Sequence, residues 1–189
     1  GHMYRDVEED IKTGQMTMFF IRPVGYVALK GAEWMGHSCL RIAVFLPPIA
    51  VLAWLVTGGI PLSFTGMVFM PLMLITGLLI WLLIQTVIGL SAAWLNSARP
   101  IWMITQKGAF VLGGMIVPIT LYPESLRLFA LVTPFPAILY APASMIVDST
   151  WSHILSMLSL QLFWIVICFI VLIFVKSRFE ERLLLRGEL

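Results

Sequence analysis

The sequence predicts an all-α integral membrane protein. Of the 189 residues, 60% are hydrophobic and 12% are charged, and the mean hydropathy is +0.96. A water-soluble domain does not carry this much apolar surface. No charged residue lies between Arg41 and Arg99, a run long enough for two spans of about 20 residues each. The net charge of +2 gives no indication of a nucleic-acid partner.

The first segment, "YRDVEEDIKTGQ", predicts a short amphipathic helix outside the membrane. Tyr4, Val7 and Ile11 recur at helical spacing and form a narrow apolar stripe. Glu8 precedes Lys12 by four residues, which is a stabilising order, and a glycine follows as a natural stop. Acidic flanks make a poor match for anionic lipid, so the stripe suits a groove in a protein, with a solvated helix as the alternative.

Two spans follow, because "TGGIPLSFTG" divides the long uncharged run. Gly58, Gly59 and Pro61 end the first helix, and Ser63 or Thr65 can cap the second. We expect spans at about 42–56 and 67–95.

The third span is predicted to be short and broken by proline. Only residues 108–123 are available for it, Pro118 interrupts them, and we expect the span at about 108–121. "LYPES" then predicts a turn and a short outer interfacial helix at about 124–133, started by Pro123 and Glu124. Broken backbone at membrane depth must be buried in protein or face water, so we expect the break to pack inside an assembly. A kinked helix with an interfacial loop is the alternative.

The last span, at about 154–175, is uninterrupted, and the positions of Lys and Arg predict its orientation. Four spans place eleven of the twelve basic residues on one side and leave only Arg127 on the other. Both termini are therefore expected in the cytoplasm. The chain divides into a cytoplasmic region 1–36, a transmembrane domain 37–175 and a cytoplasmic tail 176–189.

The predicted spans contain no Asp, Glu, Lys or Arg. A transporter driven by an ion gradient usually needs such a group within the bilayer, so this class is disfavoured. Gln85, Gly89 and Gln161 lie within the spans, where they either pack between helices or line a pathway.

An enzyme on the outer side is a weaker interpretation. Asp148 and His153 are five residues apart, but no second carboxylate or supporting motif accompanies them. We therefore expect no catalytic residue, no cofactor and no metal site.

Two segments resemble the type-2 ABC transporter permeases. "EEDIKTGQMTMFFIRPV" is similar to the cytoplasmic segment of these permeases, and "GAFVLGGMIVPITLYPESLRLFALVTPFPAILYAP" is similar to the region near their fifth span. The two segments occur in the order that the family has. The resemblance implies a chain that forms the substrate path as a dimer, with a second copy or a homologous permease, and binds a separate cytoplasmic ABC ATPase subunit. The resemblance also implies six spans. The four predicted here would be the last four, and the first two of the family have no counterpart in this sequence.

The resemblance also assigns residues to roles. The coupling helix seated on the ATPase would use Val7, Glu8, Asp10, Ile11, Lys12 and Gly14. The helix break and exit region would comprise Gly113, Gly114, Pro118, Pro123, Glu124 and Arg127. The sequence contains no GxxxxGK[ST] loop, so ATP hydrolysis is expected in the partner chain. Together these features predict the permease subunit of an exporter in the lipid of a bacterial inner membrane. A membrane scaffold without transport and an outer-side enzyme remain the alternatives.

Overall fold

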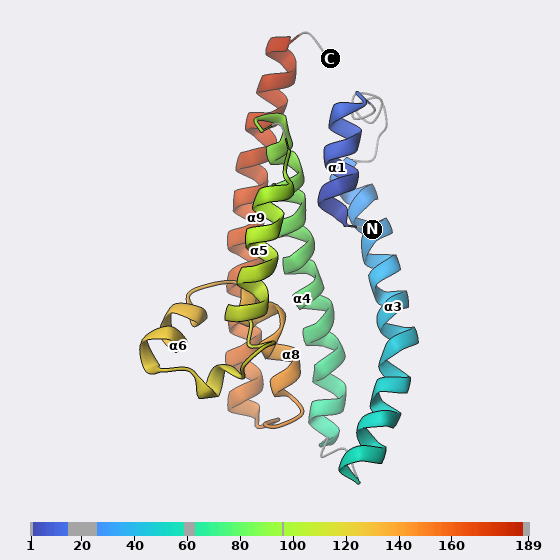
Figure 1. Ribbon diagram of the computed structural model, residues 1–189, viewed down its shortest axis with the longest axis vertical. Helices are drawn as coiled ribbons and strands as arrows, with labels where there is room; N and C mark the ends of the chain where they lie inside the picture. Colours follow the sequence, from blue (N-terminus) through green and yellow to red (C-terminus); the bar gives the residue numbers. More distant parts are fainter. Residues whose placement is uncertain (1, 15–25, 59–62, 96, 187–189) are drawn as a thin grey trace.

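The computed structural model describes residues 2–14, 26–58, 63–95 and 97–186, and all regular structure in these ranges is helical. Long helices run side by side, and short helices pack against one end of them (Figure 1). Three stretches are long and apolar enough to cross a membrane: Tyr26–Val56, Phe64–Ala93 and Trp151–Arg182. The all-α membrane class is therefore confirmed, whereas the fourth predicted crossing has no helix of that length among the described residues.

The first long helix, α3 (Tyr26–Thr57), is twice as long as the span predicted at 42–56. It continues towards the N-terminus through residues 26–41, and the Pro47-Pro48 pair further along does not end it. It ends before Gly58, which adopts a φ of 72° that glycine tolerates best. Gly59 and Pro61 of the predicted stop lie outside the described residues.

The central element is α4 (Phe64–Leu90), which the 3₁₀ helix η1 (Ser91–Ala93) extends. The Ser63 side chain caps α4 by accepting a hydrogen bond from the Gly66 N–H at 3.1 Å. Helix α4 contacts α1, α3, α5, α7, α8 and α9. It therefore holds together elements that are far apart in the sequence.

Three glycines let backbone from other elements approach α4. A methyl group on Gly66 would lie 2.8 Å from the Met145 oxygen, and one on Gly77 would lie 2.9 Å from the Ile138 oxygen. A methyl group on Gly89 would lie 2.7 Å from the Val7 Cβ atom. These positions lack a side chain because another segment occupies that space.

Helix α5 (Arg99–Leu112) corrects the prediction for the third span. A helix was expected over 108–121, but it begins nine residues earlier, with Pro100 in its first turn, and ends before Gly113. The polar residues near its start do not prevent helix formation, and the glycine pair stops the helix before Pro118 is reached.

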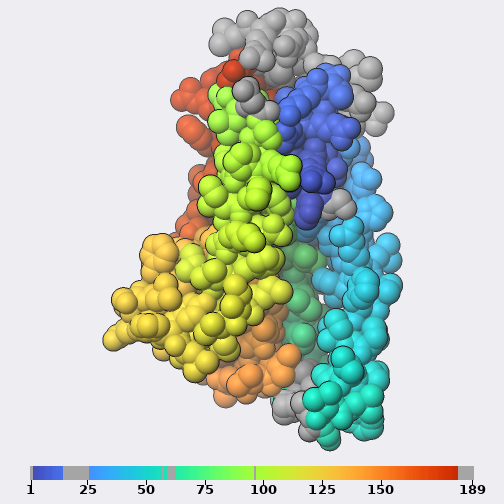
Figure 2. Space-filling model, viewed as in Figure 1, coloured from blue at the N-terminus to red at the C-terminus, as the bar shows by residue number. Residues whose placement is uncertain are grey.

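Four short helices follow: η2 (Ile119–Leu121), α6 (Glu124–Leu131), α7 (Phe135–Ile138) and α8 (Tyr140–Ser144). The bounds of α6 lie within the helix expected at 124–133. Helices α7 and α8 pack against α4, whereas α6 protrudes from the side of the bundle (Figure 2, yellow). The exposed apolar side chains of α6 include Leu128 and Phe129.

The last helix, α9 (Trp151–Arg186), runs parallel to α4 and contains the predicted span 154–175. The Thr76 hydroxyl donates to the Gln161 side-chain oxygen at 2.7 Å, and Trp94 meets Phe179 edge to face at 6.4 Å. These two contacts fix the register of α9 on α4 over most of their length.

Candidate functional site

Helix α1 (Met3–Lys12) lies beside the ends of α3 and α4 that are furthest from α8 (Figure 1). Met3, Tyr4 and Val7 are at most 2% exposed, and Val7 sits against Gly89. The apolar stripe predicted from the sequence therefore does enter a groove in a protein. That groove belongs to the same chain.

An aromatic cluster holds α1 against α4 and α5. The Tyr4 ring stacks on Trp102 of α5 with 4.8 Å between centroids, and Trp102 in turn lies 5.3 Å from Trp81 of α4. Aromatic pairs of this kind contribute about 0.5–1.5 kcal/mol beyond the area they bury. A displacement of α1 would therefore act directly on α5.

Glu8 connects α1 to the start of α5. Its carboxylate accepts the Ala98 N–H at 3.2 Å and the Lys12 ammonium at 2.6 Å. Burial disfavours the charged carboxylate, but the bonds from Lys12 and Ala98 outweigh it and hold the pKa of Glu8 below its ordinary value. The carboxylate thus sits at the positive N-terminal end of α5, where negative charge is stabilised.

Asp10 connects α1 to α3 in the same way. The Tyr26 hydroxyl donates to the Asp10 carboxylate at 2.6 Å, and the Lys30 ammonium lies 3.0 Å from the same oxygen. The carboxylate is buried, so both contacts act with little screening by water. Helix α1 is consequently fastened to α3, α4 and α5.

These contacts change how the predicted coupling residues can act. Val7, Glu8 and Asp10 point into the chain, and Ile11 is half-buried. Sequence periodicity located this helix but could not show that its apolar and acidic positions face the same protein. The side chains on the exposed face are all charged: Arg5, Asp6, Glu9 and Lys12. Gly14, predicted to stop the helix, adopts a φ of 71° two residues beyond its end.

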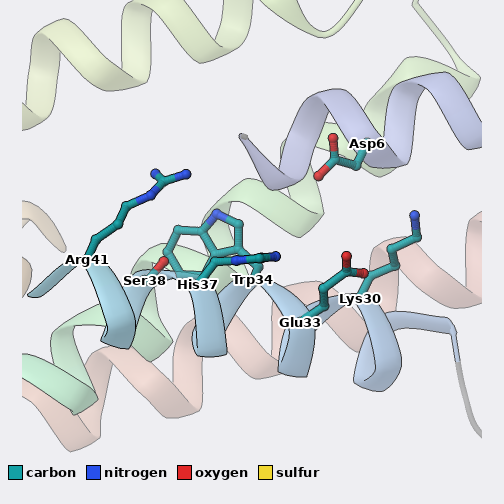
Figure 3. A pocket seen from close by; sticks show the side chains of 7 residues that line it. All are labelled: Asp6, Lys30, Glu33, Trp34, His37, Ser38 and Arg41. Atoms are coloured by element: carbon teal, nitrogen blue, oxygen red, sulfur yellow. The ribbon is translucent and has the colours of Figure 1, made fainter. Parts of the chain in front are cut away.

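Beside α1, a small pocket opens towards α3 (Figure 3). Asp6 of α1 faces a row of α3 side chains that includes Trp34, His37 and Arg41. The pocket has a volume of about 50 Å³, which leaves room for water but not for a substrate.

The backbone N–H groups of the glycine pair after α5 form hydrogen bonds with the last turn of the helix. The Gly113 and Gly114 N–H groups donate to the carbonyls of Ala109 and Val111, at 2.9 and 3.3 Å. The Tyr122 hydroxyl donates to the same Val111 carbonyl. Gly114 has a φ of 78°, as expected of a residue just beyond a helix end. The break therefore lies at the glycine pair, and not at Pro118 as the sequence suggested.

The other predicted residues of this region lie in the segment after the break. Pro118 precedes η2, and Pro123 caps α6. Glu124 and Arg127 are exposed on α6 and do not line the hollow described next.

A hollow of about 660 Å³ lies between the broken end of α5, helix α8 and the start of α9. Its volume is in the range of small-molecule sites, roughly 300–1,000 Å³. Its lining is mostly apolar, and its polar side chains are Thr120, Tyr140, Ser144, Asp148 and His153.

Asp148 and His153 are thus brought together, with Ser144 as a third group that sequence reasoning missed. The His153 Nε2 atom lies 2.8 Å from the Ser144 hydroxyl oxygen, which itself donates to the Ala141 carbonyl at 2.8 Å. The Asp148 carboxylate is 4.0 Å from His153 Nδ1, beyond hydrogen-bonding distance. It does not orient the imidazole as the carboxylate of a hydrolytic triad does. The Thr150 N–H bonds to Asp148 and lowers the pKa of this carboxyl.

The two intramembrane glutamines differ. The Gln161 amide donates to the carbonyls of Met73 and Ala137, both at 2.9 Å, and the side chain is fully buried. Gln161 is therefore a packing residue that joins α9 to α4 and α7. The Gln85 oxygen is buried and has no hydrogen-bond partner among the described residues.

The fold and these sites define a helical membrane protein with a tightly seated terminal helix and a hollow at its opposite end. A family model with the description "ABC-2 family transporter protein" matches residues 2–178. The chain belongs to this family, whose members are transport permeases. No curated protein and no solved structure matches the chain.

Proposed function

We propose that this chain is the membrane-spanning permease subunit of an ATP-driven exporter, acting as a dimer and coupled through α1 to a separate ATPase in the cytoplasm. The observation that carries the proposal is the attachment of α1 to three other helices. Glu8 joins it to α5, Asp10 to α3, and Val7 to Gly89 of α4. A force applied to α1 would reach all three helices through these direct contacts.

In this proposal the exposed charges of α1 meet the ATPase, and the α1 end of the bundle is cytoplasmic. Arg5, Asp6, Glu9 and Lys12 present both signs of charge, which suits a specific protein partner better than a lipid surface. Val7, Glu8, Asp10 and Ile11 act by holding α1 in place. The far end, with the break and α6, then lies at the exit between two permeases.

Reversal of the exposed charges tests the coupling. In nanodiscs that contain the permease and its ATPase, we expect Asp6→Lys with Glu9→Lys to reduce transport-stimulated ATP hydrolysis about five- to tenfold, since each exposed charge pair contributes up to about 1 kcal/mol. Basal hydrolysis by the ATPase would be unchanged.

The matched control is Glu180→Lys with Glu181→Lys on α9, which changes the net charge equally on another exposed segment. Its stimulation should stay close to that of the unaltered chain. An equal loss of stimulated ATP hydrolysis in both double variants, or no loss of it in either, would refute the assignment of α1 as the coupling helix.

A further inference from the structure

The hollow at the far end of the bundle has walls suited to an organic ligand. Met115, Pro118, Leu139 and Val147 supply apolar surface from both sides of the break. Gly113 and Gly114 contribute only backbone to the lining, and Leu139 packs directly against Gly113, where a Cβ atom would lie 2.7 Å from the Leu139 Cδ1 atom. An apolar molecule of modest size would bury much of its surface here and gain from leaving water.

The charge in the lining of the hollow is negative. Among the described residues that line it, Asp148 is the only one that is charged at neutral pH when histidine is neutral, and none is Lys or Arg. One Asp148 oxygen accepts the Thr150 N–H, and no basic side chain other than His153 lies within ion-pair distance among the described residues. The carboxylate is half-exposed and available to a ligand.

The surrounding polar groups favour the same sign of charge. The His153 Nε2 atom is already engaged with Ser144, so the ring does not offer that nitrogen to an anion. Tyr140 contributes an aromatic ring to the lining, and aromatic faces attract cations. An anionic ligand would be repelled by the negative charge of Asp148, which has no Lys or Arg partner among the described residues, whereas a cation would be attracted to it.

We propose that this hollow binds a lipophilic cation, with the apolar body against Met115, Pro118, Leu139 and Val147 and the positive charge beside Asp148. The inference rests on the proposed function, since it names the class of substrate that would occupy the path close to its exit.

Two ions of almost the same shape and opposite charge test the proposal. Equilibrium dialysis of the purified chain in a neutral detergent would use tetraphenylphosphonium and tetraphenylborate. We expect saturable binding of the phosphonium only. Asp148→Asn should weaken it about five- to tenfold, because it removes the carboxylate that faces the cation.

Two further variants separate the hollow from general effects. Glu181→Gln removes an exposed acid at the opposite end of α9 and should leave phosphonium binding unchanged. Ala143→Trp places a large side chain at an exposed position of the lining and should abolish binding while circular dichroism stays the same. Equal binding of both ions, or an unchanged affinity in Asp148→Asn, would overturn the proposal.

Failure of the ligand proposal can be distinguished from failure of the proposed function. Loss of phosphonium binding with intact ATPase coupling would refute only the ligand class. Normal phosphonium binding with no ATPase response to the α1 variants would refute only the coupling.

Discussion

Gln161 carries an unusual share of the polar contacts in the middle of the bundle. Its amide group bonds to two backbone carbonyls, one on α4 and one on α7, and its oxygen accepts from Thr76. The Ala137 carbonyl belongs to a helix of four residues, which cannot satisfy its own last carbonyls. Gln161 therefore supports an element that is too short to be stable alone.

Replacement of Gln161 by leucine should lower the free energy of unfolding by about 1–3 kcal/mol, because the buried Ala137 carbonyl loses its partner. Unfolding in mixed micelles, followed by circular dichroism, measures the change. Ser159→Ala on the exposed face of α9 serves as the control and should stay within about 0.5 kcal/mol of the unaltered chain. A Gln161→Leu variant as stable as the control would show that the amide contributes nothing.

The sequence located residues of this kind without revealing their partners. Gln161 could be recognised as polar within a span, but pathway and packing roles remained open, because spacing along one helix does not show what lies opposite. Ser144 was missed because a lone serine in a proline-rich segment carries no signal. It becomes visible only when the fold brings α8 to the start of α9.

At the scale of single elements, α1 is the clearest case of a helix whose position the sequence predicts without showing which protein surface its apolar face meets. The apolar stripe and the acidic positions were both evident, but whether they face the parent chain or a partner depends on tertiary packing. Helix α5 was misplaced for a local reason. The sequence predicts the interruption at Pro118, but Gly113 and Gly114 come before this proline, and glycine can end a helix by adopting a left-handed conformation.

The attachment of α1 should depend on pH through Glu8. Because the pKa of Glu8 is lowered in the folded chain, its stabilisation is complete above the ordinary value of 4.5 and is lost as the pH falls through the lower value. A spin label at Glu9→Cys, in a chain without other cysteines, should become more mobile on acidification to about pH 3.

The comparison variant is Glu8→Gln, which lacks the titrating carboxyl. Its spin label should be more mobile at neutral pH, because the attachment of α1 is weakened by about 1–3 kcal/mol. The mobility of the label should also change less on acidification. An identical acid response in both chains would assign the transition to another group.

At the scale of the whole molecule, composition alone predicted the class, since so apolar a chain is soluble only in lipid. The predicted spans 42–56 and 154–175 fall within α3 and α9, and the span 67–95 runs two residues past η1. The register of α9 on α4 could not be predicted, because the Thr76–Gln161 hydrogen bond and the Trp94–Phe179 contact leave no periodic pattern in the sequence.

We propose that the dimer covers the exposed apolar side chains of α5 and of the segment after it. Ile104, Ile116 and Leu121 are exposed in this part of the chain. We expect Ile104→Cys, in a chain without other cysteines, to form disulfide-linked dimers in membranes under mild oxidation.

Ile170→Cys on α9 is the matched control, since this residue is also apolar and exposed but lies on a continuous helix. It should remain monomeric on non-reducing gels. Comparable cross-linking at both positions would indicate random collisions and contradict a dimer through α5.

The glycines of α4 have a consequence for how this sequence can diverge. Along most lipid-facing helices, one apolar residue replaces another with little effect. On α4, Gly66, Gly77 and Gly89 meet a loop, a four-residue helix and α1, and even alanine at these sites would collide with backbone or with Val7. Related chains can therefore drift freely in the oily residues between these three sites, while inheritance of the sites themselves is constrained by shape and not by affinity for lipid.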